Sequence, residues 1–419
     1  MEPPTKMSRP TEKRLPVPDD VVFDILTWLP VKSLVRFRYV SKSWYSTITN
    51  PIFITTHLNL NKAKESLSTD NNNNNNNNGY LLYTHVPKDF SSSHELCTAV
   101  YNSDHTLTQI SAFQIPFSGF NVVSFCNGMF CLDCLTDHGD HIICLWNPSI
   151  RKFKTLAPVR LIDYVDSGTL RLDSVTLGLA YNSQNNDFKI LRLARFYEII
   201  EEVINQLVME AEIYTSSTDS WRKVEISVES LSGPIFLFNN LGKRCIFVNG
   251  ALHFIAYGQG YDFILSFDVD DERFREIKLP QNYSSGFNLR SRQLEVYKGS
   301  LALIVFCHDP VNRGCICLIW EMEEYGVAES WTWTKKCITM DSFYSCYGCI
   351  DNGEILIKNA NGLVSFDPEN HQNIFAIEDA RWADYTANSM ESLVLLDGGK
   401  VYLNTKISLL NFLERLLFW

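Results

Sequence analysis

The chain has 419 residues, of which 45% are hydrophobic and 13% aromatic, enough for two domains with sizeable cores. Its 37 basic and 48 acidic side chains give a formal charge of −11, which argues against nonspecific binding to nucleic acid or to anionic membranes. It contains no run of 18 apolar residues and no apolar signal-peptide core, so we expect no membrane contact and a location in the cytoplasm, the nucleus or both.

The N-terminal part has helical patterning. Residues 1–14 are charged and proline-containing and are predicted to be disordered, and three short helices are predicted within residues 15–58. The boundary signals are Asp19 or Asp20 and then Pro30 for the first helix, and Ser41 and then Asn50-Pro51 for the third. Apolar residues fall on more than one helical face, and some forty residues make only a thin core. Part of this apolar surface is therefore expected to contact a partner.

A helix-turn-helix DNA-binding module is the alternative for this segment. It has four basic residues in the second helix and its flank: Lys32, Arg36, Arg38 and Lys42. The acidic remainder of the chain and the lack of a basic stripe disfavour it.

Residues 59–79 separate this segment from the rest of the chain. They are polar and include eight consecutive asparagines, Asn71 to Asn78. Because such a tract cannot bury apolar surface, we expect a disordered linker.

One phrase, a polar turn followed by an apolar run, then recurs through residues 80–406. The glycine-containing copies are Asn127-Gly128-Met129-Phe130, Asn249-Gly250-Ala251-Leu252, Lys298-Gly299-Ser300-Leu301, Asn352-Gly353-Glu354-Ile355 and Gly398-Gly399-Lys400-Val401; a sixth unit, Asn186-Asp187-Phe188-Lys189, lacks the glycine. The steps between them are 59, 63, 49, 54 and 46 residues. A period near 50 is typical of kelch-like propeller blades.

We therefore predict an all-β propeller of six blades, with seven as the alternative. The strands around Tyr80–Tyr83 and Thr106–Ile115 precede the first full unit. We expect them to complete the blade that begins near Gly399, so that the two ends of the chain close the ring.

The twelve cysteines are expected to be reduced and to pack as small hydrophobic residues. One cluster, Cys131, Cys134, His138 and His141, supplies four zinc-type ligands within eleven residues. That spacing is too short for a chain to wrap the ion, so strand and turn packing is the preferred interpretation. We expect no metal and no cofactor.

The last residues, 407–419, have a helical stripe of leucines. Glu414 and Arg415 leave no basic face for anionic lipid, so we expect an amphipathic helix that packs against the propeller.

These motifs resemble those of a known family. The segment from Val17 to Trp44 resembles the F-box of plant F-box proteins that carry an F-box-associated, kelch-like domain. Later phrases are similar to that family too: Ser124-Phe125-Cys126-Asn127-Gly128, Leu145-Trp146-Asn147-Pro148, Phe247-Val248-Asn249-Gly250 and Glu391-Ser392-Leu393-Val394. The sequence departs from the usual pattern at Val17, Trp28 and Ser41, where the family commonly has Leu, Arg and Cys.

The resemblance implies a substrate-recognition subunit of a cullin–RING ubiquitin ligase. The F-box would dock on the Skp adaptor, the propeller would recruit a protein substrate, and the ligation chemistry would belong to other subunits, so the chain itself would not be an enzyme. Carried over by position, the adaptor contacts would be Pro18, Val22, Ile25, Leu26, Leu29, Pro30, Val31, Leu34 and Trp44. A glycan-binding propeller, or a propeller enzyme carrying an F-box, is the alternative.

The substrate surface is expected at one end of the propeller. Repeat symmetry places equivalent loops at the same end, here His138–His141, Tyr257–Asp262, His308–Gly314 and Asn359–Gly362. We assign Tyr257, Tyr261 and His308 as candidate substrate-binding residues. The alternative is that these loops are solvated turns.

Overall fold

The fold was described from a computed structural model of the chain. The structure describes residues 17–70, 80–85, 95–101, 107–115, 120–135, 140–156, 159–160, 170–200, 203–228, 233, 235–237, 245–281, 283, 287–308, 315–340, 345–350, 353–359, 362–368, 372–377, 383–388 and 390–395. The predicted disordered N-terminus, asparagine run and C-terminal helix lie outside these residues.

The N-terminal domain contains four helices, one more than predicted. They are α1 (Asp19–Thr27), α2 (Val31–Phe37), α3 (Lys42–Ile48) and α4 (Pro51–Asp70). Residues 59–70, predicted to be linker, are thus helical. The sequence signal was misread: Asn50-Pro51 ends α3 but also starts α4, because proline is well suited to the first helical position. The Asn50 side chain accepts a hydrogen bond from the backbone N–H of Ile52 at 2.8 Å.

The helix starts differ in how they are capped. The residue before α1 is Pro18, whose side chain cannot accept a capping hydrogen bond. The predicted caps, Asp19 and Asp20, instead lie in the first turn, where the helix dipole favours their charge. The prediction for α3 is confirmed, since the Ser41 Oγ accepts a hydrogen bond from the backbone N–H of Trp44 at 3.1 Å.

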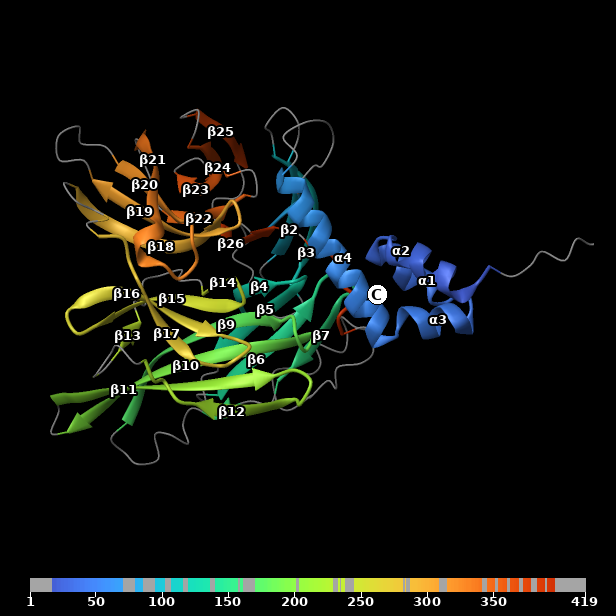
Figure 1. The fold of residues 1–419 in the computed structure, drawn as a ribbon, viewed down its shortest axis with the longest axis horizontal. Coiled ribbons are helices and arrows are strands. Elements are labelled where there is room, and N and C mark those ends of the chain that lie inside the picture. Colours follow the sequence, from blue (N-terminus) through green and yellow to red (C-terminus); the bar gives the residue numbers. More distant parts are fainter. Residues whose placement is uncertain are drawn as a thin grey trace, which may run out of the picture.

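The second domain is a propeller of six blades, as predicted (Figure 1). In sheet order the first blade is β26 (Ala383–Asn388), β1 (Tyr80–His85), β2 (Glu95–Tyr101) and β3 (Leu107–Gln114). The second is β4 (Asn121–Cys126), β5 (Met129–Leu135), β6 (Asp140–Asn147) and β7 (Lys152–Thr155), with β8 (Val159–Arg160) pairing with β6. The third is β9 (Leu170–Asn182), β10 (Asp187–Ile200), β11 (Val203–Thr215) and β12 (Ser220–Val224).

The remaining three blades follow in chain order. The fourth has β13 (Phe236–Leu237) and β14 (Ile246–Val248), both paired with β15 (Ala251–Gly258), then β16 (Tyr261–Asp268) and β17 (Phe274–Lys278). The fifth is β18 (Asn288–Tyr297), β19 (Ser300–His308), β20 (Cys315–Met322), a short 3-10 helix η2 (Ala328–Ser330) and β21 (Trp331–Met340). The sixth is β22 (Ser345–Cys349), β23 (Ile355–Asn359), β24 (Gly362–Asp367) and β25 (Gln372–Ile377).

The recurring polar phrase forms the turn between the first and second strands of blades two to five, and its glycine in blade six, Gly353, lies between β22 and β23. In blade four, Asn249 and Gly250 both have positive φ angles, 51° and 74°. Two consecutive left-handed residues make the hairpin turn that matches the twist of the flanking strands, and the Asn-Gly pair tolerates this conformation best. The repeated phrase is therefore a hairpin signal, which is why it marked the blades correctly.

The ring closes by joining the two ends of the propeller sequence, as predicted, but through a different strand. β26 pairs antiparallel with β1, for example Leu82 with Ala387. The predicted unit near Gly399 lies outside the described residues. Because the first two strands of this blade come from opposite ends of the chain, no hairpin joins them, and the blade has no turn phrase to find.

Each blade buries its faces against its neighbours. One core cluster joins Leu191 and Ile213 of blade three to Phe254 and Leu265 of blade four. Among the helices in the described part of the chain, none combines the length and apolarity needed to cross a bilayer.

Candidate binding surfaces

The first candidate surface is an exposed apolar stripe on α1. Val21, Ile25 and Trp28 are 42%, 56% and 62% exposed, and their spacing of four and three residues places them on one helical face. The opposite face of α1 contributes Val22 and the fully buried Leu26 to the core of the domain. The helix is thus apolar on two sides, and the described structure covers only one of them.

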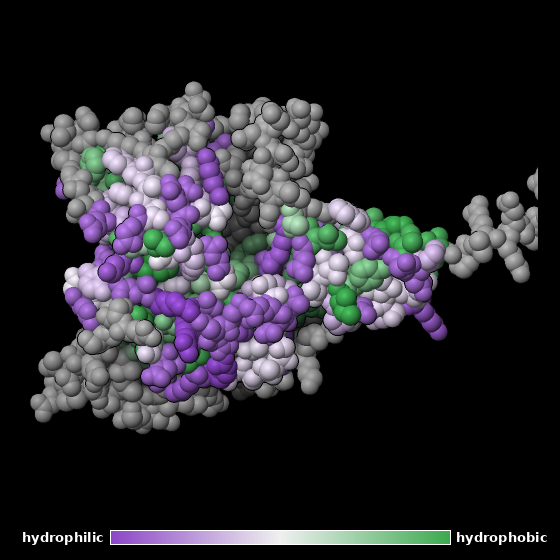
Figure 2. All heavy atoms as spheres, in the orientation of Figure 1, coloured by the Kyte–Doolittle hydropathy of each residue, from purple (hydrophilic) through white to green (hydrophobic). Residues whose placement is uncertain are grey.

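Further exposed apolar residues lie elsewhere on the helical domain. Tyr39 and Val40 follow α2, and Tyr45 lies on α3. Arg38 lies over the Tyr39 ring, 4.8 Å from its centroid, and donates a hydrogen bond of 2.6 Å to the Tyr39 hydroxyl. Figure 2 shows hydrophobic side chains on the surface of the helical domain. Apolar groups of this size on a small domain mark an interaction surface.

The predicted adaptor contacts fall into three environments. Pro18, Ile25 and Pro30 are exposed, and Val22, Leu29 and Trp44 are half-buried. Leu26, Val31 and Leu34 are at most 1% exposed, in a core with Ile48 and Phe53.

These last three residues are buried by the four helices together with Leu393, from the C-terminal part of the propeller, so in this structure they have no exposed surface to offer an adaptor. The predicted adaptor contacts do not include five exposed apolar residues of the domain: Val21, Trp28, Tyr39, Val40 and Tyr45. A helical stripe drawn through Ile25 would have found Val21 and Trp28.

The second candidate surface lies at one end of the propeller. In a four-stranded up-and-down blade, the turns between strands one and two and between three and four lie at one end, and the turn between two and three lies at the other. The first end faces the helical domain, because the β4–β5 and β6–β7 turns contact the segment that packs on it. The β15–β16 turn therefore points away from the helices, as Figure 1 shows.

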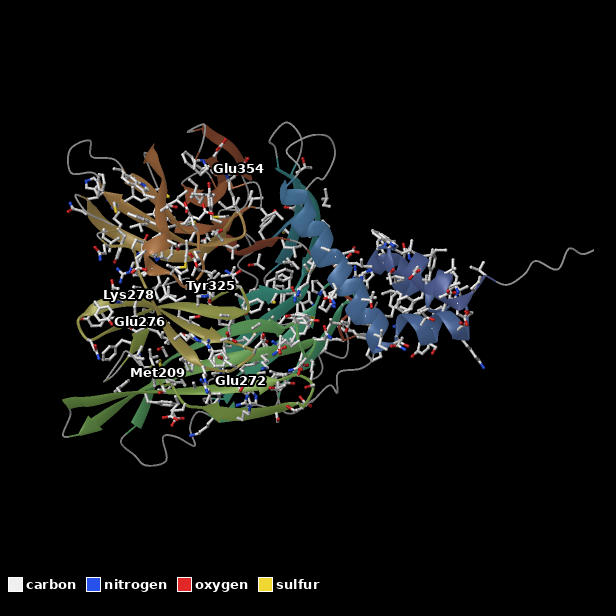
Figure 3. The ribbon with its side chains drawn as sticks, viewed as in Figure 1. Met209, Glu272, Glu276, Lys278, Tyr325 and Glu354 are labelled. Atoms are coloured by element: carbon white, nitrogen blue, oxygen red, sulfur yellow. The ribbon has the colours of Figure 1, made fainter. Side chains whose placement is uncertain are left out.

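Tyr257 and Tyr261 flank this β15–β16 turn, and both are more than one-third exposed. The Tyr257 ring lies 6.5 Å from the ring of Phe236, centroid to centroid. The Tyr261 hydroxyl donates a 3.0 Å hydrogen bond to Glu276, a residue labelled in Figure 3. Both tyrosines thus present rings that are already held by neighbours.

His308 belongs to the neighbouring blade, and the seam between the blades is tied at this end. Asp262, next to Tyr261, accepts hydrogen bonds from the Tyr283 hydroxyl at 3.0 Å and pairs with Arg292 at 2.6 Å. Arg292 and the exposed Leu289 lie on β18, whose first residue pairs with His308. The structure thus brings the three predicted substrate-binding residues to the same end of two adjacent blades.

The other loops predicted to form the substrate surface are largely outside the described part of the chain. Residues 136–139, 309–314 and 360–361 lie outside the described part of the chain. His141 belongs to β6 instead of a loop; it is 2% exposed and its Nε2 lies 3.1 Å from Asp133. It is therefore removed from the predicted substrate surface.

The cysteine cluster is divided between two paired strands, as the strand-and-turn interpretation predicted. Cys131 on β5 and Cys144 on β6 are fully buried, and His138 lies outside the described residues. Within the described part of the chain there is no group of three metal-binding side chains. Burial raises the pKa of the nearby Cys126 thiol to about 12, so it remains a neutral thiol, the form that is neither nucleophile nor ligand.

Polar contacts join the blades at the end near the helices. The Nζ of Lys189 on β10 lies 2.8 Å from Glu272 of blade four. At the equivalent position of the next blade, the Nε2 of His253 lies 2.8 Å from the hydroxyl of Tyr325 in blade five. Figure 3 labels Glu272 and Tyr325 at these seams. Burial lowers the pKa of His253 to about 4, so this imidazole is neutral near pH 7.

Comparison with known protein families identified both domains. Residues 16–56 match the F-box domain, and residues 85–393 match the F-box associated beta propeller domain. An F-box/kelch-repeat protein of Arabidopsis thaliana is 25% identical over 396 residues, which cover 94% of this chain and 95% of that protein. F-box protein CPR1 of the same organism is 25% identical, covering 91% of this chain and 89% of its own length.

Solved structures are more distant. A putative 6-phosphogluconolactonase from Bacteroides fragilis covers 76% of this chain and 99% of its own, with 9% identity and a TM-score of 0.35. The polysaccharide lyase Uly1 covers 54% of each chain, with 9% identity and a TM-score of 0.33. At these scores neither structure bears on function.

Proposed function

The chain belongs to the F-box proteins with an F-box-associated β-propeller, found in plants, and from that premise we propose that it is a substrate-recognition subunit of a cullin–RING ubiquitin ligase. The F-box docks on a Skp-type adaptor, and the propeller recruits a protein substrate. The chain is a non-catalytic subunit that acts in the cytoplasm, the nucleus or both.

The observation that carries this proposal is the second apolar face of α1. This helix contributes Leu26 to the core of its own domain and still leaves Val21 and Ile25 exposed on another face. Burying one such side chain contributes roughly 1.5–3 kcal/mol, so the stripe can supply a large share of the affinity for an adaptor.

The test is capture of a purified Skp-type adaptor by the full chain. Ile25→Ala with Trp28→Ala is expected to weaken adaptor binding by roughly a hundredfold, since two exposed anchors are removed. Among the predicted adaptor contacts, Leu29 is less suitable for substitution, because it also packs on the domain core and its loss would affect folding as well as binding. Trp333→Ala, which removes a tryptophan of blade five that is also more than half exposed, is the matched control and should bind normally. Unchanged capture by the double variant would refute the proposal.

The substrate is proposed to bind the end of the propeller that points away from the F-box. Tyr257 and Tyr261 are exposed at that end, His308 lies partly buried at the same end of the adjacent blade, and rigid aromatic side chains are frequent anchors in protein recognition. A substrate on that end leaves the F-box face free for the adaptor.

Affinity capture followed by mass spectrometry tests this placement. Replacing Tyr257, Tyr261 and His308 together with alanine should remove the substrate from the captured set while the adaptor remains. If substrate recovery equals that of the wild type, the recognition surface lies elsewhere on the propeller.

A further inference from the structure

The F-box and the propeller are joined by a short segment, Met390–Val394, which lies beyond the ring-closing strand β26. Along this segment the contacts alternate between the two domains. Glu391 and Leu393 contact the F-box, while Met390, Ser392 and Val394 contact the propeller. The segment therefore separates its side chains between two domains.

On the F-box side, Glu391 replaces a missing helix cap. The residue before α2 is Pro30, which has no side-chain acceptor, and the backbone N–H of Val31 instead donates to the Glu391 carboxylate at 2.8 Å. A carboxylate at a helix N-terminus also complements the helix dipole. The backbone carbonyl of the same glutamate accepts a 3.2 Å hydrogen bond from Asn61 of α4.

Leu393 completes the F-box core. It is 1% exposed and belongs to one core with buried residues from all four helices: Leu26, Val31, Leu34, Ile48 and Phe53. Leu393 lies more than 300 residues after these helices in the sequence.

On the propeller side, the backbone of Ser392 is held by the β6–β7 turn. The Asn147 side-chain amide donates to the carbonyls of Ser392 at 2.9 Å and Val394 at 2.8 Å. The backbone approach is so close at the β4–β5 turn that a Cβ on Gly128 would lie 2.5 Å from the Ser392 Cβ.

α4 adds a second attachment. Leu58 is buried in the core shared by blades two and three, and the Lys62 ammonium lies 4.2 Å from the centroid of the Tyr181 ring. Two separate contacts, one through α4 and one through Met390–Val394, restrain rotation as well as translation of the F-box.

We propose that Met390–Val394 is an interdomain clamp that fixes the orientation of the F-box on the propeller, with Glu391 and Leu393 as its positioning residues. Because the clamp follows β26, the F-box reaches its fixed position only in a chain whose ring has closed. The consequence for ubiquitin transfer, a constant distance between substrate and ligase, rests on the proposed function; the fixed orientation itself does not.

The test measures the distance between the domains in the full chain. Fluorescent amino acids that do not require cysteine are incorporated at the exposed positions Lys42 and Gln259, and single-molecule energy transfer reports the distance distribution. The wild type is expected to give one narrow peak. Glu391→Ala with Leu393→Ala should lose that peak and give a broad distribution, and the amides of residues 19–62 should exchange faster.

Glu391→Gln is the matched control, because its side-chain oxygen can still accept from Val31; it should retain the narrow peak. Glu391→Ala alone removes only the cap and guards against a fold failure of the double variant; it should broaden the peak by less. A narrow, unchanged peak in the double variant would overturn the clamp. Adaptor capture, measured in parallel, reports on the proposed function separately, since loss of the clamp leaves the exposed stripe of α1 in place.

Discussion

The two domains dispose of their apolar residues in opposite ways. In its described strands, the propeller packs apolar residues into cores shared by neighbouring blades, such as Leu265 in the core between blades three and four. The F-box has too few residues for that, so it borrows Leu393 for its core and still leaves Ile25 and Trp28 exposed. The difference shows that the small domain is built to be completed by others: on one side by its own propeller, on the other by a partner.

The strongest way to break this comparison is to make the same cavity in both domains. Leu265→Ala and Leu34→Ala each remove a fully buried leucine and should each cost about 2–5 kcal/mol. Leu265→Ala should lower the melting temperature of the propeller, because its core spans two blades. Leu34→Ala should speed amide exchange in residues 19–62 and leave the blades protected. Equal loss of protection in both domains would mean that they unfold as one unit.

A pH titration sharpens the description of the propeller seams. His253 has a pKa of about 4 when folded against an ordinary value of 6.5, so the unfolded chain binds the extra proton between these values. The effect of His253 on the free energy of unfolding is therefore absent above about pH 6.5. As the pH drops to 4, proton binding by the unfolded chain should lower the free energy of unfolding by about 3 kcal/mol. Denaturant unfolding at pH 7 and pH 4.5 measures it. His253→Gln should flatten the dependence in this window; an equally steep loss in that variant would place its origin in other groups.

Two asparagine–glycine turns of the propeller have similar backbone conformations, but only one of them contacts the clamp. Gly128 and Gly250 both follow an asparagine and have φ angles of 79° and 74°, so alanine at either costs about 1–2 kcal/mol in backbone strain. The Cβ at position 250 would meet open space, whereas at position 128 it would collide with Ser392. Gly128→Ala should therefore destabilise by about 1–3 kcal/mol more than Gly250→Ala, and should also broaden the interdomain distance. Equal destabilisation by the two substitutions would show that Met390–Val394 can move away from a Cβ at position 128 without a cost in free energy.

The smallest effect tests helix capping within the F-box. Ser41→Ala removes the acceptor for the Trp44 N–H and should cost about 1 kcal/mol. The control is Ser43→Ala, an exposed residue of the same helix whose substitution should change stability little. Thermal unfolding followed in the helical region compares the two, and equal losses would argue against the cap.

Local signals in the sequence predicted the elements whose structure is decided locally. The Asn-Gly phrases marked the hairpins because only a few residue types accept two successive left-handed conformations. Ser41 marked a helix start because only short polar side chains accept a hydrogen bond from the first free N–H groups of a helix. Signals with two meanings failed. Asn50-Pro51 was read as a stop, although the same pair begins α4, and the closing strand was sought near Gly399 because the blade made from both chain ends carries no hairpin phrase.

By itself the sequence determined the two domains, their order and the repeat, since these follow from turn chemistry and from the periodicity of apolar residues. It predicted six blades with seven as the alternative, and the structure has six. Only the tertiary structure decided which apolar residues of the F-box are core and which are surface, because Leu26 and Ile25 are neighbours of equal hydrophobicity and differ only in what lies opposite them. It also decided that Glu391 caps α2 and that Leu393 enters the F-box core. Contacts between residues 360 positions apart depend on how the ring closes, and no local pattern in the chain encodes them.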